Sequence, residues 1–354
     1  MYYVSGVDLH KRYVTCCALD SDGAVVAAER RLPTTVEALL GFVTALEGPA
    51  TVAVEATLHW AWVHDQLSAA GYPVVVAHPQ QVKLICHARC KTDPIDARKL
   101  ADLLRTHLLP AIWVPDAETR ARRQLLRGRA FLVRLRTKLK NRIHAYLAEQ
   151  NERVEVSDLY GQAGRAWLAT VALPREVREQ VELVLELVDH LLRRLDRRIR
   201  DRVTLSAEAK QLMTIPGVGP YGALLILAEL GRLERFPSAQ AVASYAGLVP
   251  STRSSGGKTA HGSVGMAGSH WLKWILIEAV VTLKRRPSPV RNHYEKLLRA
   301  KGKQKAAVAA VRKLATYIYW MRREGWTYEQ WLAQHQAAKR EGRPVHSLAT
   351  VAVA

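Results

Sequence analysis

The fold is decided at the start of the chain, by the stretch YYVSGVDLHKRYVTCCALDSDGAVVAAERRL at residues 2–32. Apolar and β-branched residues gather there in three runs, Tyr3–Val7, Tyr13–Leu19 and Ala24–Arg31. The last two runs are separated by the segment DSDG, whose composition is typical of a tight turn. The stretch therefore predicts a meander of three strands.

Strands and helices alternate over the following segment. Helical periodicity is present at 35–46 and 59–70, and short apolar strands are indicated at 51–54 and 73–77. A further helix is expected from Asp93 to about Arg105. Such alternation predicts an α/β sheet, and we place this N-terminal domain at residues 1–115.

Four carboxylates stand at strand ends or at a helix start. Asp8 and Glu55 each follow an apolar run, while Asp93 and Asp96 lie in the segment KTDPIDAR at residues 91–98. Asp93 is predicted to be the N-cap of its helix, with Pro94 at the first helical position. Two acids at a helix start are ordinary by themselves, but an acid at the end of a buried strand has no capping role. Together the four predict a divalent metal site.

Charge and composition indicate the partner. The 52 Lys and Arg residues exceed the 32 Asp and Glu residues, which gives a net charge of +20. This balance favours nucleic acid. No apolar stretch of about 18 residues and no signal-peptide layout is present, so we expect a cytoplasmic protein without a membrane partner. Four cysteines are too few for a disulfide framework, and Cys86 and Cys90 around His87 are expected to be reduced rather than to bind zinc.

Strand signals cease after Ala117. Residues 120–142 contain ten Lys or Arg and no acid, interleaved with apolar residues, which predicts a basic amphipathic helix or helix pair. Without acids the helix cannot relieve its own repulsion, so phosphate contact is favoured over a solvated face. The predicted nucleic-acid contacts in this segment are Arg120, Arg122, Arg123, Arg127, Arg134, Arg136, Lys138, Lys140 and Arg142.

Two later segments carry structural signals. The apolar residues of 175–203 recur at steps of three and four, as in a coiled-coil seam, and we expect them to pack on the basic helix or on another subunit. The segment IPGVGPYG at 215–222 resembles a helix-hairpin-helix motif, in which Gly217 and Gly219 let the backbone approach a phosphate, although an ordinary tight turn would look similar.

The Gly- and Ser-rich segment 244–269 reads as either a linker or a binding loop, and Arg253, Lys258 and His261 are placed to hold an anion. With the helices that flank it, this segment completes the predicted division. It comprises a helical and coiled-coil region at 116–205, a mostly helical domain at 206–335 and a tail at 336–354.

With these residues in view, the chain resembles the DEDD transposases of the insertion-sequence one-ten family, bacterial mobile-element recombinases guided by a bridge RNA. The resemblance covers roughly residues 3 to 320. It rests on GVDLHK, VEAT and KTDxxDA in the first half, and on IPGVG, YAGLVP and SSGGK in the second.

The resemblance implies a RuvC-like, RNase H-type N-terminal domain in which Asp8, Glu55, Asp93 and Asp96 bind Mg²⁺, for which Mn²⁺ can substitute. It implies a C-terminal transposase domain with a nucleophilic serine, carried over to Ser255 with Ser254 as the close rival. The family's basic run after SGGK is here TAHGS, so His261 takes the place of a phosphate-binding Arg or Lys.

The implied partners are DNA at the element ends and target, a noncoding bridge RNA, and further copies of the chain in a dimer or tetramer with a composite site. The implied chemistry is strand exchange through a phosphoserine–DNA intermediate. Two alternatives stay open: a hydrolytic RuvC- or RNase H-like nuclease in which Ser255 is only a loop residue, and a non-enzymatic DNA-binding protein.

Overall fold

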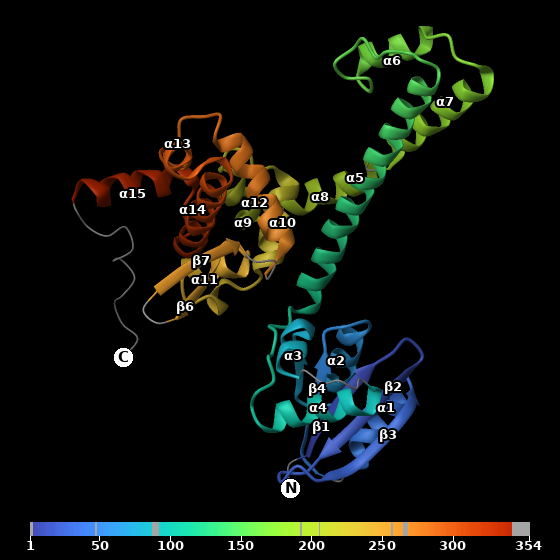
Figure 1. Cartoon of the computed structure of the whole chain (residues 1–354), viewed down its shortest axis with the longest axis vertical. Coiled ribbons are helices and arrows are strands. Elements are labelled where there is room, and N and C mark those ends of the chain that lie inside the picture. Colours follow the sequence, from blue (N-terminus) through green and yellow to red (C-terminus); the bar gives the residue numbers. More distant parts are fainter. Residues whose placement is uncertain are drawn as a thin grey trace. The chain divides into compact units, whose positions relative to one another are not determined.

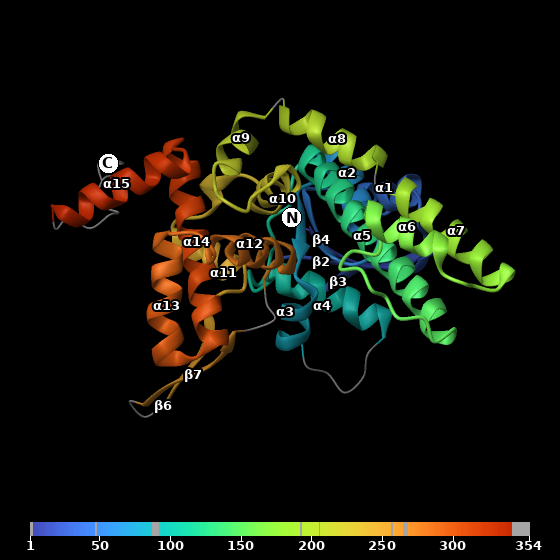
Figure 2. The ribbon, with the colours of Figure 1, turned by 90° about the horizontal axis from the view of Figure 1, so that it is seen from above.

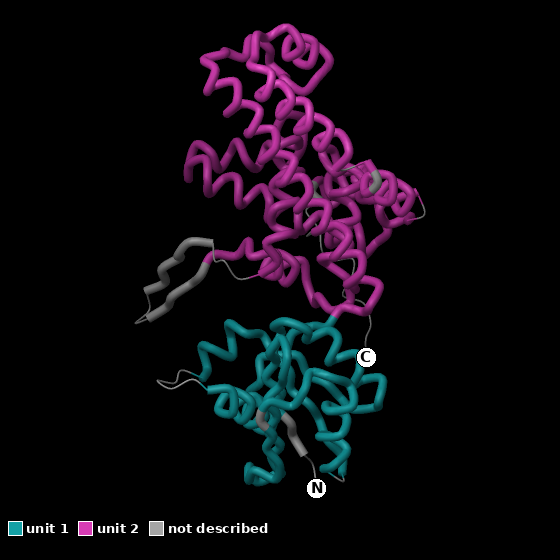
Figure 3. The backbone as a smooth tube through the Cα atoms, turned by 90° about the vertical axis from the view of Figure 1, so that its right-hand side faces the viewer, with its two compact units in different colours: residues 1–114 teal, residues 115–354 magenta. Residues whose placement is uncertain are grey.

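The structure is a computed structural model that describes residues 3–46, 48–86, 92–191, 193–204, 206–255, 258–264 and 268–341. For residues 3–5, 30, 194, 251–255, 258–264 and 339 the description covers the backbone and not the side chain. The chain divides into two compact units, Met1–Val114 and Pro115–Ala354 (Figure 3).

Unit 1 is built on a five-stranded mixed sheet with the order β3-β2-β1-β4-β5 (Figure 1). The strands β1 (Tyr3–Leu9), β2 (Tyr13–Leu19) and β3 (Val25–Pro33) form an antiparallel meander. The strands β4 (Ala50–Glu55) and β5 (Val74–Ala77) continue the sheet parallel to β1. The predicted meander and the mixed α/β domain are confirmed.

Helices cover both faces of this sheet. On one face, α1 (Val36–Thr44) and α2 (Trp60–Ala69) pack on the side chains of Val7, Val52 and Val54. On the other face lies α4 (Asp93–Arg105), whose Ala97 and Ala101 pack on β2. A short helix, α3 (Pro79–Ile85), follows β5. Because successive strand residues alternate between the faces, Cys16 and Cys17 are buried on opposite sides, both as free thiols. Cys90 and His87, invoked in the zinc reading, lie outside the described residues.

Unit 2 begins with one long helix. The sequence predicted either one helix or a pair of helices at this place. The helix α5 runs over 33 residues (Ala117–Glu149), and α6 (Gln162–Thr170) and α7 (Arg175–His190) fold back on its second half (Figures 1 and 2). The buried side chains of Val181, Val184 and Val188 pack against Ile143 and Leu147. The expected seam therefore packs on the basic helix, while a coiled coil in the strict sense stays a prediction. The helix expected at 175–203 is described as α7 and α8 (Arg193–Thr204).

The remaining helices share one apolar core. These are α9 (Ala207–Met213), α10 (Pro220–Leu230), α11 (Ala239–Tyr245), α12 (His270–Leu283), α13 (Pro289–Lys301), α14 (Lys303–Glu324) and α15 (Tyr328–Arg340), with the 3-10 turn η1 (Leu233–Arg235). Nearly every residue of α10 is buried, and Trp331 of α15 is 1% exposed in the same cluster.

One pair of strands lies after Ala117, in the region where the sequence carries no strand signal. The segment after α11 forms an antiparallel hairpin of β6 (Pro250–Ser255) and β7 (Lys258–Val264). Both strands are rich in Ser, Thr, Gly and basic residues, so they lack the apolar alternation by which a strand is recognised from sequence. Among the described residues, none of the helices has the length and apolarity needed to cross a membrane.

Candidate metal centre

Asp8 and Glu55 lie at the same edge of the unit 1 sheet. The parallel strands β1 and β4 pair Val7 with Val54, and the two acids are the residues that follow. Paired residues of neighbouring strands share a face, and successive residues alternate. Because Val7 and Val54 face α1 and α2, both carboxylates belong to the face that α4 covers.

The helix α4 approaches this face closely because small residues meet there. A Cβ added at Gly6 would overlap the carbonyl oxygen of Ala97 and lie 2.8 Å from the nitrogen of Ala101. Ala53, the partner of Gly6 on β4, packs against Leu100 of the same helix. This close contact brings the first turn of α4 to the end of β1.

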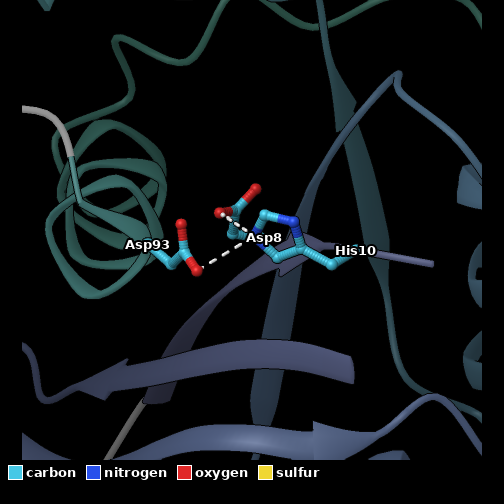
Figure 4. Close-up of side chains that lie close together, drawn as sticks. All are labelled: Asp8, His10 and Asp93. Atoms are coloured by element: carbon cyan, nitrogen blue, oxygen red, sulfur yellow. Dashed lines mark ion pairs between the residues drawn. The ribbon is translucent and has the colours of Figure 1, made fainter. Parts of the chain in front are cut away.

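As a result, Asp8, His10 and Asp93 converge (Figure 4). The Nε2 atom of His10 lies 3.3 Å from Oδ2 of Asp8 and 3.2 Å from Oδ2 of Asp93. One ligand atom from each residue lies within 4.8 Å of the other two. Nε2 is buried and lies near both carboxylates, yet among the described residues it has no hydrogen-bond partner of acceptable geometry.

The electrostatics of Asp8 favour a cation at this position. Its side chain is 15% exposed, and burial raises its pKa. His10 lowers the pKa of Asp8, whereas the carboxylates of Asp93 and Asp96 raise it. Several acids near one point repel each other until a positive charge separates them.

Tyr13 also contacts Asp93. Its Oη atom donates a hydrogen bond of 3.2 Å to Oδ2 of Asp93, and its ring stacks on His10 with centroids 4.5 Å apart. The backbone N–H of His10 donates to the carbonyl oxygen of Tyr13 at 3.0 Å, which closes the β1–β2 hairpin. Burial and the neighbouring Asp93 raise the pKa of Tyr13, so it stays a hydrogen-bond donor near neutral pH.

The sequence analysis did not single out His10 or Tyr13 as site residues. The signal for His10 was its position two residues after Asp8, since alternate residues of an extended chain share a face. Tyr13 begins the next strand of the hairpin and therefore lies opposite His10. Neither position could be tied to Asp93 before the placement of α4 was known.

Among the described residues, Asp96 and Glu55 do not belong to this group of three. Asp96 lies one turn after Asp93 on α4, where its Oδ1 is 3.4 Å from Nζ of Lys99. Glu55 ends β4 at the same sheet edge as Asp8. That all four acids are ligands stays a prediction. One detail is corrected: Thr92 is the N-cap of α4 and Asp93 is its first helical residue, without a side-chain capping bond.

The three converging side chains fit a divalent cation. Carboxylate oxygens suit Mg²⁺ and Mn²⁺, and an imidazole nitrogen is a common ligand of first-row transition metals. A cation would stabilise the ionised form of Asp8, whose pKa is raised, by accepting a lone pair from its carboxylate. It would also accept the lone pair of the buried Nε2 of His10. The donor set favours Mn²⁺ at least as well as Mg²⁺, because a nitrogen is among its atoms.

The predicted nucleic-acid contacts on α5 fall into two groups. Arg123 donates from Nε to the carbonyl oxygen of Ala228 at 2.7 Å, and from Nη2 to that of Glu229 at 2.9 Å. Arg127 donates from Nε and Nη2 to Oε1 of Glu229 at 3.1 and 2.8 Å, and the Glu229 side chain is only 1% exposed. These two arginines hold the last turn of α10 within unit 2.

Among the other basic residues of α5, Arg129 donates from Nε to Oδ1 of Asp196 on α8 at 2.6 Å. Arg122 makes an exposed pair with Glu118, and Arg120 donates to the carbonyl oxygen of Pro115. Three cations lie over aromatic rings: Arg134 over Trp271, Lys140 over Tyr160 and Arg142 over Tyr146. The description shows no partner for the guanidinium Nε of Arg136, and Lys138 is exposed.

The predicted helix-hairpin-helix segment consists of α9, a tight turn and α10. Gly217 has φ +92°, and a Cβ there would lie 2.6 Å from Cβ of Thr282 and 2.9 Å from the carbonyl oxygen of Ala279. The close packing against α12 therefore accounts for this glycine. Gly219, the N-cap of α10, faces open space. Phosphate binding here stays a prediction.

The serine segment is described by its backbone only. Ser254 and Ser255 end β6, where they pair with Thr259 and Lys258 across the hairpin. The side chains of these residues and of Arg253 and His261 lie outside the described ones, as do Gly256 and Gly257.

Two protein-family models match the chain, and both describe transposases. One, described as "Transposase" and named for the DEDD transposases of IS110, matches residues 5–151. The other, described as "Transposase IS116/IS110/IS902 family", matches residues 209–295. The chain is therefore an insertion-sequence transposase by class. It belongs to the IS110/IS116 family, which confirms the family part of the resemblance.

Individual relatives agree with this membership. The chain is 28% identical over 340 residues to a "Probable family 20 transposase" of Pseudomonas aeruginosa, which covers 90% of this chain and 93% of the relative. It is 26% identical to the "Transposase for insertion sequence element IS1111A" of Coxiella burnetii, over 89% of this chain and 88% of that protein.

Among solved structures, RuvC of T. thermophilus in complex with a Holliday junction substrate covers 32% of this chain and 100% of its own, at 16% sequence identity and a TM-score of 0.25. A similarity with so low a TM-score supports no conclusion about this chain.

Proposed function

We propose that the protein cuts and rejoins DNA strands during movement of an insertion sequence, with unit 1 as the metal-dependent centre and the serine of the β6–β7 hairpin as the nucleophile. The convergence of Asp8, His10 and Asp93 is the observation that carries this proposal. The three side chains offer one ligand atom each within 4.8 Å of the other two, so a single cation could be held by all of them.

The sheet topology supports a nuclease domain. The order β3-β2-β1-β4-β5, in which only β2 runs against the other strands, is that of an RNase H-type fold. In this arrangement the acids that end β1 and β4 lie beside the helix that covers the same face. The RuvC-like assignment rests on this topology and on the acids.

In this proposal Asp8 and Asp93 hold a divalent metal, with His10 as a third donor and with Asp96 and Glu55 completing the acidic surface. A bound metal supplies positive charge next to the scissile phosphate and lowers the pKa of a hydroxyl group there. Tyr13 fixes the orientation of Asp93 through its hydrogen bond. The buried position of Asp8 keeps water from screening its charge.

The serine step is a transesterification. The Oγ of Ser255, or of its neighbour Ser254, attacks the phosphorus and forms a phosphoserine bond. The bond from phosphorus to the deoxyribose oxygen breaks, and that oxygen takes up the proton that the serine loses. A strand hydroxyl reverses these steps on the new partner, so the bond energy is conserved and no ATP is required.

The proposed partners do not follow from individual side chains of the structure. DNA at the element ends and at the target, a noncoding bridge RNA that selects sequences by base pairing, and a dimer or tetramer with a composite site are expected from the family resemblance. The net charge of +20 supports contact with nucleic-acid backbones.

The test is a denaturing gel of the protein incubated with Mg²⁺ or Mn²⁺, flanking RNA and element-junction DNA. A covalent protein–DNA adduct is expected for the wild type. It should be lost in Ser255→Ala and in Asp93→Asn, and retained in Ser254→Ala. Asp102→Asn is the matched control, since Asp102 is on the same helix and pairs with Arg105 at 3.3 Å.

An adduct that survives Asp93→Asn would contradict the metal centre, and one that is lost only in Ser254→Ala would move the nucleophile by one residue. Cleavage without any adduct would favour the second candidate, a hydrolytic nuclease. That candidate is supported by the position of Asp8, His10 and Asp93, which all lie in unit 1 and could serve an attacking water without a serine.

A further inference from the structure

A basic hollow lies in unit 2, in the region where α5, α6, α7 and α8 come together. It has a volume of about 550 Å³ and is lined by both charged and aromatic side chains. This size is in the range of ligand pockets. Its cations come from three helices and are Arg136, Lys140, Arg165, Arg193, Arg197 and Arg200.

The acids that line the hollow do not balance these cations. Asp189 is bound by Arg165, whose Nη1 and Nη2 donate to its two carboxylate oxygens at 3.1 and 2.6 Å. Asp196 is bound by Arg129, whose Nε donates to it at 2.6 Å and which is not part of the lining. Within the described residues, Arg193, Arg197 and Arg200 form no ion pair.

The wall formed by α5 adds two partly buried positive side chains. Nε of Arg136 is buried and has no hydrogen-bond partner in the described part of the chain, so it is a donor that lacks an acceptor. Lys140 lies 3.9 Å from the ring centroid of Tyr160, whose Oη donates to the carbonyl oxygen of Lys140 at 2.6 Å. Burial, and then the charge of Arg136, lower the pKa of Lys140.

The residues of α8 that line the hollow are regularly spaced along the helix. Arg193, Asp196, Arg197 and Arg200 are spaced by three, four and seven residues, which places them on one side of the helix. Ile199 and Val203 are buried in the core on another side, and Arg198 and Arg202 are exposed outside the hollow. The helix thus separates arginines that line the hollow from arginines that do not.

We infer that this hollow is a binding site for the phosphodiester backbone of a nucleic acid. Guanidinium groups donate paired hydrogen bonds to phosphate oxygens, and several of them around one concavity hold adjacent phosphates without reading bases. The inference deepens the proposed function, because it adds a backbone contact in unit 2 that does not involve the residues of the metal centre.

The experiment measures binding without chemistry. The full-length protein in EDTA is titrated into a short fluorescein-labelled single-stranded DNA, an RNA of the same sequence and a DNA duplex, over a series of salt concentrations. Fluorescence anisotropy gives the affinity. The variant Arg193→Ala/Arg197→Ala is compared with Arg198→Ala/Arg202→Ala, which removes the same charge from the same helix.

For the single strands we expect the hollow variant to lose on the order of tenfold or more in affinity near 0.1 M salt, and its salt slope to fall by about 1.4, as two lost phosphate contacts require. The control variant should lose less than about threefold. The single strand, DNA or RNA, for which the hollow variant loses more affinity is the one whose backbone the hollow binds. Thermal unfolding of both variants shows that the fold is retained.

Equal losses in the two variants would show a general charge effect and overturn the inference, as would unchanged binding in both. Because the titration uses no metal and no cleavage, these results are independent of Asp93→Asn and Ser255→Ala. A failure of the strand-cutting proposal would therefore be recognised separately.

Discussion

Gly6 in β1 and Ala97 in α4 meet backbone to backbone. A Cβ at residue 6 would overlap the carbonyl oxygen of Ala97 and lie 2.8 Å from the nitrogen of Ala101. The distance between the helix and the sheet is thus set by the absence of a side chain at Gly6. Since Asp93 begins α4 and Asp8 follows Gly6 by two residues, the same contact sets the spacing of the two carboxylates.

Gly6→Ala is expected to separate α4 from β1. Overpacking of this kind costs about 1–3 kcal/mol, and here both neighbouring atoms belong to helix backbone that cannot rotate away. The variant should unfold at lower urea concentration and should lose Mn²⁺ binding, measured by calorimetry. Gly41→Ala is the control, because Gly41 on α1 has nothing within 4 Å of an added Cβ and should lie within about 1 kcal/mol of the wild type. A Gly6→Ala protein with unchanged stability and metal binding would contradict this reasoning.

Asp8→Asn should separate stability from metal binding. The folded state raises the pKa of Asp8 above that of a free aspartate side chain, chiefly through burial. A carboxyl group with a raised pKa opposes folding once it ionises. Its stabilising contribution is complete below about pH 4 and is lost as the pH rises through the shifted value.

In EDTA, Asp8→Asn should therefore gain stability relative to the wild type as the pH rises from 4 toward 7, as measured by thermal unfolding at each pH. On addition of Mn²⁺ the wild type should be stabilised and the variant should not, because a ligand is lost. A wild type that is the more stable protein in EDTA at pH 7 would show that Asp8 is held by a favourable ion pair instead.

The sequence was sufficient to predict the meander, the α/β alternation and a helix that begins next to Pro94, because each depends on local periodicity or on a Pro at a helix start, although the N-cap is Thr92 and not Asp93. It also placed Asp8 and Glu55 at the ends of strands. The four-part domain division and the roles of Ser255 and the α5 cations stay predictions.

The sequence could not provide the distance in space between segments that are far apart along the chain. His10 became part of the centre only when α4 placed Asp93 opposite it, and Arg127 became the partner of the buried Glu229 only when α10 placed that residue beside it. The β6–β7 hairpin was missed because its polar strands carry no apolar alternation. In each case a partner distant in the chain decided the outcome.

His10→Ala tests whether His10 is a ligand or only a neighbour of two acids. Its Nε2 lies within 3.3 Å of both carboxylates, and a nitrogen donor favours Mn²⁺ over Mg²⁺. We expect the affinity for Mn²⁺ to fall about tenfold and that for Mg²⁺ to change less, measured by electron paramagnetic resonance with Mg²⁺ as competitor. His64→Ala serves as control, since His64 lies on α2 beside Asp65. An equal change for both metals would argue against a nitrogen ligand.

Arg127→Ala tests whether this α5 arginine serves the fold or the nucleic acid. Removal of Arg127 leaves the Glu229 side chain, 1% exposed, with the hydrogen bond from Ser269 at 2.9 Å to its other oxygen and with the charge of Arg235 in its surroundings. An uncompensated buried charge costs about 3 kcal/mol or more. Arg122→Ala breaks only an exposed pair with Glu118 and should cost less than about 1 kcal/mol.

Addition of Glu229→Gln to Arg127→Ala should recover part of the loss, because it removes the buried charge while keeping a side chain of the same shape. Urea unfolding of the three variants measures these differences. If Arg127→Ala keeps the stability of the wild type and instead loses affinity for DNA, then Arg127 is a nucleic-acid contact and its bond to Glu229 is incidental.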